Sequence, residues 1–190
     1  KENKISKKKK YSNKIITSDE NTIYKDKDIN LVSIASYDNF HYKQVINSIK
    51  ANKNIVVEKP MCLNKKQLLE IKKYLDKKKH IKITSNLVLR VNSLFNSFRS
   101  KIKNSKIFYI EGDYIWGRKY KLSGWRSKIK DYSLTLGAGI HIIDLIMWLI
   151  NSKPISVYAV GNKIATTGTK FKKESLVVVL LRFPKNILVK

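Results

Sequence analysis

Residues 29–60 read INLVSIASYDNFHYKQVINSIKANKNIVVEKP, and this stretch decides the fold. INLVSIAS at 29–36 is short, apolar and β-branched, which is typical of a buried parallel strand. A helix is predicted over 40–50, and a second strand over 54–57 runs directly into Glu58-Lys59-Pro60. The helix pattern rests on four apolar residues at helical spacing: Phe40, Val45, Ile46 and Ile49.

The next elements repeat this alternation. An amphipathic helix is predicted over 63–79, with Asn64 as its N-cap and Gln67 as the partner in a capping box. A third strand is predicted over 81–85, and the order β-α-β-α-β with short connections indicates a parallel, doubly wound sheet. The inward face of the helix is expected to carry Leu68, Leu69, Ile71 and Leu75.

The pattern changes after about residue 105. Residues 106–116 (KIFYIEGDYIW) alternate aromatic and polar residues, which predicts a long antiparallel strand. A helix is expected over 140–150, and two more long strands over 155–165 and 175–183 are joined by the turn-like TTGTK. We therefore predict an α/β plus α+β protein: part of a nucleotide-binding α/β domain at 1–105, followed by a partial α+β domain at 106–190.

Both domains are expected to be incomplete. All seven glycines lie at or beyond Gly112, so the α/β part contains no GxGxxG turn. NILVK at 186–190 stops in the middle of a predicted strand. The sequence is therefore expected to be a piece of a longer protein.

The formal net charge is +26, which raises nucleic acid as a partner. Only five of the 40 basic residues are arginine, however, and the lysines are spread along a chain rich in Ile and Asn, as AT-rich codons dictate. We therefore expect no nucleic-acid partner. We also expect no membrane span and no signal peptide, since no long uninterrupted apolar run is present. The single cysteine, Cys62, fits a reducing cytoplasm and has no neighbours at metal-ligand spacing, so no metal site is expected.

Three segments could carry chemistry. LGAGIHIIDLIMWL at 136–149 opens a helix on two glycines and places His141, Asp144 and Trp148 on one face, although the segment taken alone favours a core helix with a structural histidine. Lys59 follows a parallel strand, where α/β sheets bind ligands and where a desolvated lysine can act as acid or base; an ordinary surface lysine is the alternative. Residues 116–132 combine tryptophan, tyrosine and arginine, which suits a sugar or anion site; the alternative is a structured loop that packs its tryptophans on the sheet.

Taken in order, these segments resemble the glucose-fructose oxidoreductase / inositol dehydrogenase / MocA (Gfo/Idh/MocA) family. The stretch from INLVSIAS to the Glu-Lys-Pro motif resembles the second half of its Rossmann domain. LVLRVNSLFNSFRSKI resembles its linking segment, and LGAGIHIIDLIMWL resembles its glycine-led helix with a His-x-x-Asp motif. The likeness extends over about residues 20–190.

The resemblance implies an NAD- or NADP-dependent oxidoreductase that acts on a hydroxyl of a sugar, amino sugar or cyclitol. Lys59 and His141 would be the catalytic acid/base residues. The cofactor would be bound by Ser36, Asp38, His41, Glu58, Lys59 and Asn86. The substrate would be bound by Asp144, Arg90, Trp116, Arg118, Trp125, Arg126 and Tyr132. The family also implies homo-oligomers formed through the open sheet of the second domain.

Two residues depart from the family pattern. Gly137 stands where many members have an aspartate four residues before the histidine, and Tyr37 stands where many have a proline. Three alternative functions remain open at this point. They are a lyase or glycosidase of the same fold that uses transient oxidation, a catalytically inactive relative retained for subunit contacts, and a basic nucleic-acid-binding protein.

Overall fold

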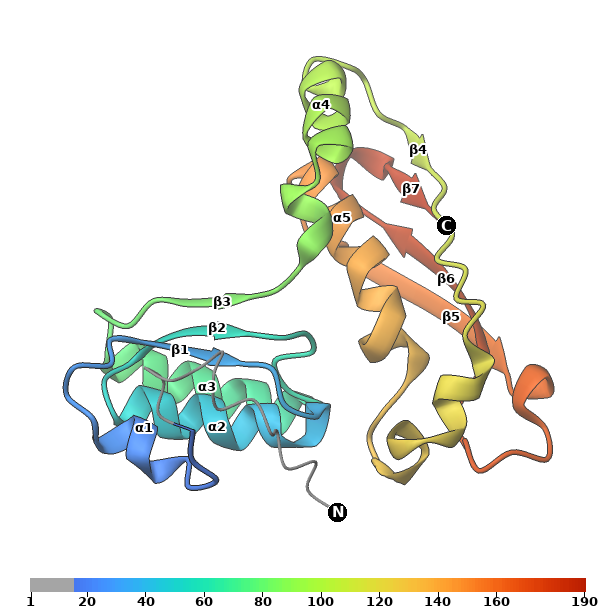
Figure 1. Ribbon diagram of the computed structural model, residues 1–190. Coiled ribbons are helices and arrows are strands. Elements are labelled where there is room, and N and C mark those ends of the chain that lie inside the picture. The colour runs from blue at the N-terminus through green and yellow to red at the C-terminus, as the bar shows by residue number, and fades with distance from the viewer. Residues whose placement is uncertain (1–15) are drawn as a thin grey trace.

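The structure, a computed structural model, describes residues 16–190 and contains two units, each built on its own sheet (Figure 1). The first unit holds three parallel strands in the order β1-β2-β3: β1 (Leu31–Ile34), β2 (Asn54–Val57) and β3 (Ile83–Ser85). After a short α1 (Asn21–Lys25), helices α2 (Asp38–Lys50) and α3 (Lys65–Lys77) connect the strands. Both connecting helices lie on the same side of the sheet. The predicted β-α-β-α-β order is confirmed.

The core of the first unit lies between this sheet and its helices. Burial alternates along β1, with Val32 and Ile34 inside and Leu31 57% exposed. The parallel strand predicted here is confirmed, and it is buried on the one face that the described helices cover. The remaining buried residues of this cluster are Val45, Ile46, Ile49, Ile55, Val57, Ile71 and Ile81.

Helix α3 begins as the sequence predicts. The Asn64 side chain accepts a hydrogen bond from the Gln67 amide, and the Gln67 side chain accepts one from the amide of Leu63. The predicted inward face is partly wrong, because Leu68 and Leu69 are about half exposed. Only Ile71 is fully buried, since this helix meets the core along a narrower stripe than its apolar pattern suggested.

The second unit is a four-stranded mixed sheet in the order β4-β7-β6-β5. Its strands are β4 (Tyr109–Ile110), β5 (Ser156–Asn162), β6 (Leu176–Arg182) and β7 (Leu188–Val189). Helix α5 (Ile140–Ile150) packs on the sheet through Ile146, against Leu181, Phe183 and Val189. Helix α4 (Ser93–Ile102) lies beside α5 (Figure 1), and Arg99 of α4 stacks on Trp148 of α5.

Short helical turns make most of the remaining connections. They are η1 (Val88–Val91), η2 (Lys119–Ser123), η3 (Trp125–Lys128), the π-helical turn η4 (Thr135–Gly139), η5 (Ile164–Thr166) and η6 (Pro184–Asn186). The antiparallel pair β5 and β6 and the bounds of α5 match the predicted strands and helix closely.

The long antiparallel strand predicted over 106–116 is wrong. Only Tyr109 and Ile110 form a strand, and they pair in parallel with β7. Hydrogen bonds to residues 188–190 extend this contact from Phe108 to Gly112. An aromatic and polar alternation becomes a strand only where a partner strand lies opposite, and β7 supplies two residues.

Among residues 16–190, no helix is both long enough and apolar enough to cross a bilayer. Within the same residues, no three His, Cys, Asp or Glu side chains gather closely enough to hold a metal ion.

Candidate active site

The carboxyl ends of the three parallel strands meet at one edge of the first unit. Ladder hydrogen bonds continue past the strands, because the amide of Glu58 donates to Ile34 and the amide of Asn86 donates to Val57, both at 2.8 Å. The Asn86 side chain then donates to Oε1 of Glu58 at 2.7 Å, and Ser36 Oγ donates to Gln44 at 2.7 Å. Three of the predicted cofactor residues, Ser36, Glu58 and Asn86, thus line one sheet edge, where doubly wound proteins bind ligands.

His41 lies beneath this edge. Its side chain is fully buried, with Nδ1 2.7 Å from the carbonyl oxygen of Pro60 and Nε2 3.0 Å from that of Ser36. Since both ring nitrogens face protein carbonyls, this histidine joins the loop after β1 to the loop after β2. We therefore assign it to holding the two loops together rather than to touching a cofactor.

Lys59 follows β2 directly, and its peptide bond to Pro60 is cis. Its ammonium crosses to the second unit and donates a hydrogen bond to the carbonyl oxygen of Gly137. Burial lowers the pKa of Lys59, the charges of Asp38 and Glu58 oppose that shift, and the charge of Arg126 adds to it. The result is a partly desolvated lysine that points across the boundary between the two units.

Asp38 is the nearest buried carboxylate in this network. It begins α2 and is only 9% exposed. Burial raises its pKa, while the nearby charges of His41, Lys59 and Arg126 lower it. Asp38 therefore adds a carboxylate, besides Glu58, to a site that also holds Lys59 and Arg126.

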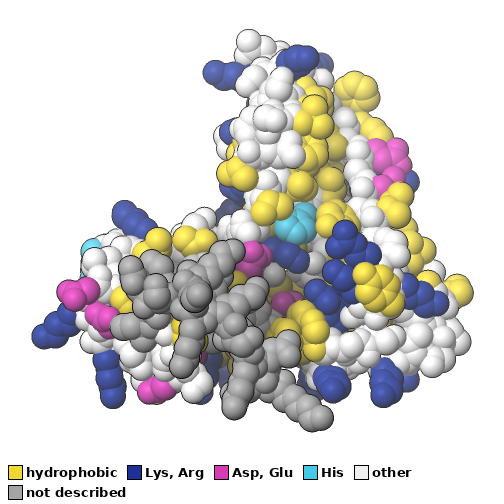
Figure 2. All heavy atoms as spheres, viewed as in Figure 1, with side chains coloured by type: hydrophobic (Ala, Val, Ile, Leu, Met, Phe, Trp, Pro, Cys, Tyr) yellow, Lys and Arg dark blue, Asp and Glu magenta, His cyan; other side chains and the backbone are white. Residues whose placement is uncertain are grey.

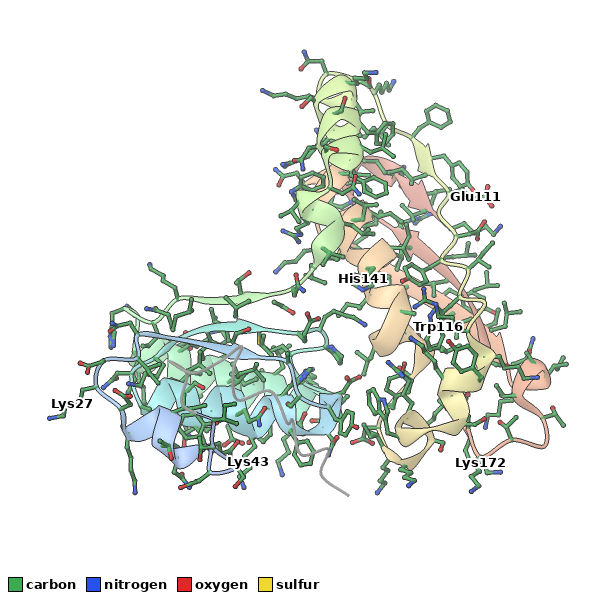
Figure 3. The ribbon with its side chains drawn as sticks, in the orientation of Figure 1. Lys27, Lys43, Glu111, Trp116, His141 and Lys172 are labelled. Carbon is green, nitrogen blue, oxygen red and sulfur yellow. The ribbon has the colours of Figure 1, made fainter. Side chains whose placement is uncertain are left out.

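The second unit contributes His141 from the first turn of α5 (Figure 3). Its ring stacks on Tyr114 with centroids 5.9 Å apart. Its Nδ1 atom is the only buried side-chain nitrogen or oxygen without a hydrogen-bond partner among residues 16–190. Burial lowers the pKa of His141, and the positive charge of Lys59 lowers it further. A neutral imidazole with a free nitrogen is the state expected of a proton acceptor.

Asp144 lies three residues after His141 but does not pair with it. The Asp144 carboxylate accepts two hydrogen bonds from Arg90, from Nε at 2.7 Å and from Nη2 at 2.5 Å. This bidentate pair joins η1 to α5. The two residues expected to bind substrate thus bind each other in this structure, and their role toward substrate stays a prediction.

The glycines before His141 form part of the π-helical turn, a feature that often marks functional sites. Another side chain closely approaches the backbone at Gly137: a Cβ atom there would lie 2.1 Å from the hydroxyl oxygen of Tyr132. Neither Gly137 nor Gly139 has a positive φ, and among residues 16–190 Gly168 is the only glycine that does. Gly137 is needed for space, not for its backbone angles.

The loop of residues 116–132, rich in aromatic side chains, closes the site on the side of the second unit. Trp125 stacks on Tyr37 of the first unit, with ring centroids 4.8 Å apart. The Arg126 guanidinium lies 4.2 Å from the ring centroid of Trp125 and 5.7 Å from that of Trp116. Tyr132 is buried beneath this group, whereas Arg118 is exposed. Figure 2 shows Lys and Arg side chains gathered on this part of the second unit, beside a histidine.

Two contributors escaped prediction. Tyr114 lies within the aromatic and polar stretch that predicted a strand, and only the fold shows that it stacks on His141. The backbone carbonyl of Gly137 has no signature in a sequence at all. The structure therefore brings Lys59 and His141 into one site through residues that sequence patterns did not mark.

Comparisons with known proteins agree with this architecture. The sequence profile described as "Oxidoreductase family, NAD-binding Rossmann fold" (Gfo/Idh/MocA) matches residues 2–86, and the "GFO/IDH/MocA C-terminal domain" matches residues 105–190. A search of curated protein sequences found no match.

Solved structures show the same fold at low identity. Myo-inositol 2-dehydrogenase from Lactobacillus plantarum matches with a TM-score of 0.80 and 20% identity, over 91% of this chain and 53% of that one. Scyllo-inositol dehydrogenase from Lactobacillus casei, with bound NAD(H) and scyllo-inositol, matches with a TM-score of 0.75 and 20% identity, over 88% of this chain and 51% of that one. UDP-N-acetylglucosamine 3-dehydrogenase from Acidithiobacillus ferrooxidans matches with a TM-score of 0.66 and 17% identity, over 84% of this chain and 48% of that one. The chain thus spans about half the length of each of these structures.

Proposed function

The chain belongs to the Gfo/Idh/MocA family of NAD-binding oxidoreductases, and from this premise we propose a specific reaction for the whole protein. It transfers a hydride between NAD or NADP and a hydroxyl-bearing carbon of a sugar, amino sugar or cyclitol. Lys59 and His141 are the two catalytic residues. The substrates named for the similar structures, two inositols and a nucleotide sugar, support this choice of substrate class.

One observation carries the proposal. Lys59 and His141 are far apart in the sequence and belong to different units, yet Lys59 donates to the carbonyl of Gly137, one turn before His141. The charge of Lys59 also acts on the pKa of His141. A hydrogen-bond donor and a neutral proton acceptor at one place are what the oxidation of an alcohol requires.

In this reaction, the Lys59 ammonium exchanges the Gly137 carbonyl for the substrate hydroxyl and donates a hydrogen bond to its oxygen. The neutral imidazole of His141 accepts the hydroxyl proton as the carbon–hydrogen bond breaks and the carbon–oxygen bond becomes a carbonyl. The bound nicotinamide supplies the acceptor for the departing hydride. In the reverse direction, the imidazolium of His141 returns the proton.

Residues at the ends of β1, β2 and β3 fit a dinucleotide's polar groups. Ser36 is exposed at the edge, and Glu58 and Asn86 are half-buried and bonded to each other. Asp38 adds a carboxylate to the same edge. These side chains would hold the nicotinamide half of the cofactor, and Tyr37 with Trp125 would close over it from the side of the second unit.

On the substrate side, Arg126 is held between the rings of Trp116 and Trp125, and no ion pair engages its guanidinium among residues 16–190. Aromatic faces with a free guanidinium suit a polyhydroxylated ring. Arg118, Asp144 and Arg90 complete the proposed substrate-binding set.

We also propose that the protein is a homo-oligomer. The side of the second sheet that carries Tyr158 and Leu180 is apolar, with these residues 64% and 49% exposed. A molar mass of more than one chain in light scattering after size exclusion would support this, and a monomer at all concentrations would contradict it.

The test of the activity uses the full-length protein. Titration of the cofactor into the protein should detect binding of NAD(H) or NADP(H). The absorbance of the reduced nicotinamide should then follow the oxidation of inositols, hexoses and nucleotide sugars. Lys59→Ala and His141→Ala should each lower turnover at least about 100-fold with the fold preserved. Lys66→Ala and His80→Ala, which change exposed residues, serve as controls. Normal turnover by both site variants would contradict the proposal.

A further inference from the structure

Tyr132 is a buried residue that the proposed reaction does not use. Its side chain is 2% exposed. Its ring packs edge-on against Trp125 and Phe171, with centroids 6.1 and 6.2 Å away, and the Arg126 guanidinium lies 5.9 Å from the ring centroid. Such packing gives the ring one position.

That position sets the hydroxyl of Tyr132 against the backbone of Gly137. A Cβ atom on Gly137 would lie 2.1 Å from the hydroxyl oxygen, 2.5 Å from Cζ and 2.9 Å from Cε2 of the ring. Real Cβ atoms do not approach other atoms so closely. The Tyr132 hydroxyl therefore occupies the space in which a side chain at position 137 would place its own atoms.

Gly137 in turn holds the catalytic lysine. Its carbonyl oxygen accepts the hydrogen bond from Lys59, and its amide donates to Ser133 at 2.9 Å. The chain of contacts therefore runs from the buried Tyr132 ring to the Gly137 backbone, and from there to the Lys59 ammonium. His141 follows Gly137 by about one helical turn, at the start of α5.

We propose that Tyr132 is a positioning residue for Lys59: its hydroxyl replaces a side chain at position 137 and holds the Gly137 carbonyl at the place where Lys59 binds. The role of Lys59 in catalysis rests on the function proposed above, but its placement by Tyr132 does not. Tyr132 and Gly137 thus act as a pair, in which the tyrosine supplies volume and a polar atom that glycine lacks.

The experiment measures the reactivity of Lys59 in the chain, with no cofactor or substrate present. Acetic anhydride is applied at pH 8, and the acetylated fraction of the Lys59 peptide is followed by mass spectrometry. In Tyr132→Phe the ring is kept and only the hydroxyl is lost, so the turn at Gly137 gains room. We expect Lys59 to react about fivefold faster, as the loosening of one hydrogen bond implies.

Two controls separate positioning from general loosening. Tyr120→Phe changes a tyrosine of the same segment that is 73% exposed, and it should leave Lys59 unchanged. The exposed Lys66 should be acetylated at the same rate in all variants. An unchanged Lys59 rate in Tyr132→Phe, or an equal rise at Lys66, would overturn the proposal.

A double-mutant cycle tests the pair itself. Gly137→Ala should lower the midpoint of urea unfolding strongly, because its Cβ meets the Tyr132 hydroxyl. Tyr132→Leu shortens that side chain, so Gly137→Ala should cost clearly less in the Tyr132→Leu background. Equal costs in the two backgrounds would contradict the pairing, and this comparison also decides the matter if Gly137→Ala alone does not fold.

The two proposals fail separately. If the full-length protein binds no NAD(H) but Tyr132→Phe still speeds the acetylation of Lys59, only the proposed function is lost. If the enzyme is active, a positioning role further predicts that Tyr132→Phe lowers kcat and displaces its pH profile with little change in KM, whereas a purely structural role would lower the amount of folded enzyme alone.

Discussion

Two histidines show how differently the two units surround an imidazole. His41 in the first unit is fully buried, and both its nitrogens lie within hydrogen-bond distance of carbonyl oxygens of neighbouring loops. His141 in the second unit has a buried Nδ1 with no partner among the described residues. An unsatisfied buried polar atom costs stability, whereas a satisfied one fixes the surrounding structure.

The difference between His41 and His141 distinguishes a structural histidine from one proposed to take part in the reaction. The first unit presents Lys59 beside hydrogen-bonded side chains such as Glu58 and Asn86. The second unit presents His141, whose buried Nδ1 has no hydrogen-bond partner among residues 16–190. The following four predictions test this contrast, from the largest expected effect to the smallest.

Replacement of His41 tests whether the histidine with carbonyl oxygens near both ring nitrogens stabilises the first unit. His41→Ala leaves two carbonyls facing a cavity and should lower the free energy of unfolding by about 3 kcal/mol, measured by urea titration with far-UV circular dichroism. The exposed His80 is the control, and His80→Ala should change it by less than about 0.5 kcal/mol. Equal changes in unfolding free energy for His41→Ala and His80→Ala would contradict a stabilising role of His41.

The ion pair between Arg90 and Asp144 tests whether α5 is anchored as firmly as the loops of the first unit. The Asp144 side chain is 13% exposed and that of Arg90 is 44% exposed. Asp144→Asn should lower the free energy of unfolding by about 1 kcal/mol, since solvent screens the exposed arginine. Asp76→Asn breaks the exposed pair with Lys72 and should cost less than about 0.5 kcal/mol. A larger cost at Asp76 would reverse this ranking.

The stack of Tyr37 on Trp125 tests the contact between the two units. Tyr37→Ala should cost about 0.5–1 kcal/mol. It should also raise hydrogen exchange at residues 119–128 while leaving 44–50 of α2 unchanged. If exchange in the loop stays as in the wild type, the stack does not hold the units together.

The pH dependence tests His141 itself. Its pKa in the folded protein lies below the usual value of 6.5, so below pH 6.5 the unfolded chain binds a proton that the folded chain resists. Stability from this group is complete above pH 6.5 and is lost as the pH falls toward the folded pKa. Burial is the main cause of this lowered pKa, the charge of Lys59 adds to it, and the charges of Glu58 and Asp144 oppose it.

His141→Gln isolates this contribution from all other titrating groups. The difference in unfolding free energy between the wild type and His141→Gln should move against the wild type as the pH falls from 8 to 5.5. Urea titrations at both values measure it. A difference that does not change with pH would show that His141 keeps its ordinary affinity for protons.

Local patterns in the sequence were sufficient for much of the fold. The alternation of strand and helix between residues 31 and 57, the cap at Asn64 and the start of α5 at Ile140 all depend on neighbours a few residues away. The prediction failed where a partner strand decides the outcome, as at β4, or where the width of a packing face does, as at Leu68 and Leu69.

The candidate site divides in the same way. The sequence marked Lys59 and His141 through the motifs around them, and family resemblance supplied their roles. It placed His41 on the cofactor, whereas the structure buries it between two loops. It expected Asp144 and Arg90 to meet substrate, whereas they bind each other across 54 residues.

By itself, then, the sequence determined the order of the elements, the position of Lys59 at the end of a parallel strand and the helix that carries His141. These follow from the spacing of apolar residues, from caps and from turns, all of which act within about one turn of chain. Only the tertiary structure decided that Lys59 bonds to the Gly137 carbonyl and that the Tyr132 hydroxyl fills the space left by that glycine. Such contacts depend on the packing of two units against each other, and packing of this kind leaves no periodic trace in the sequence.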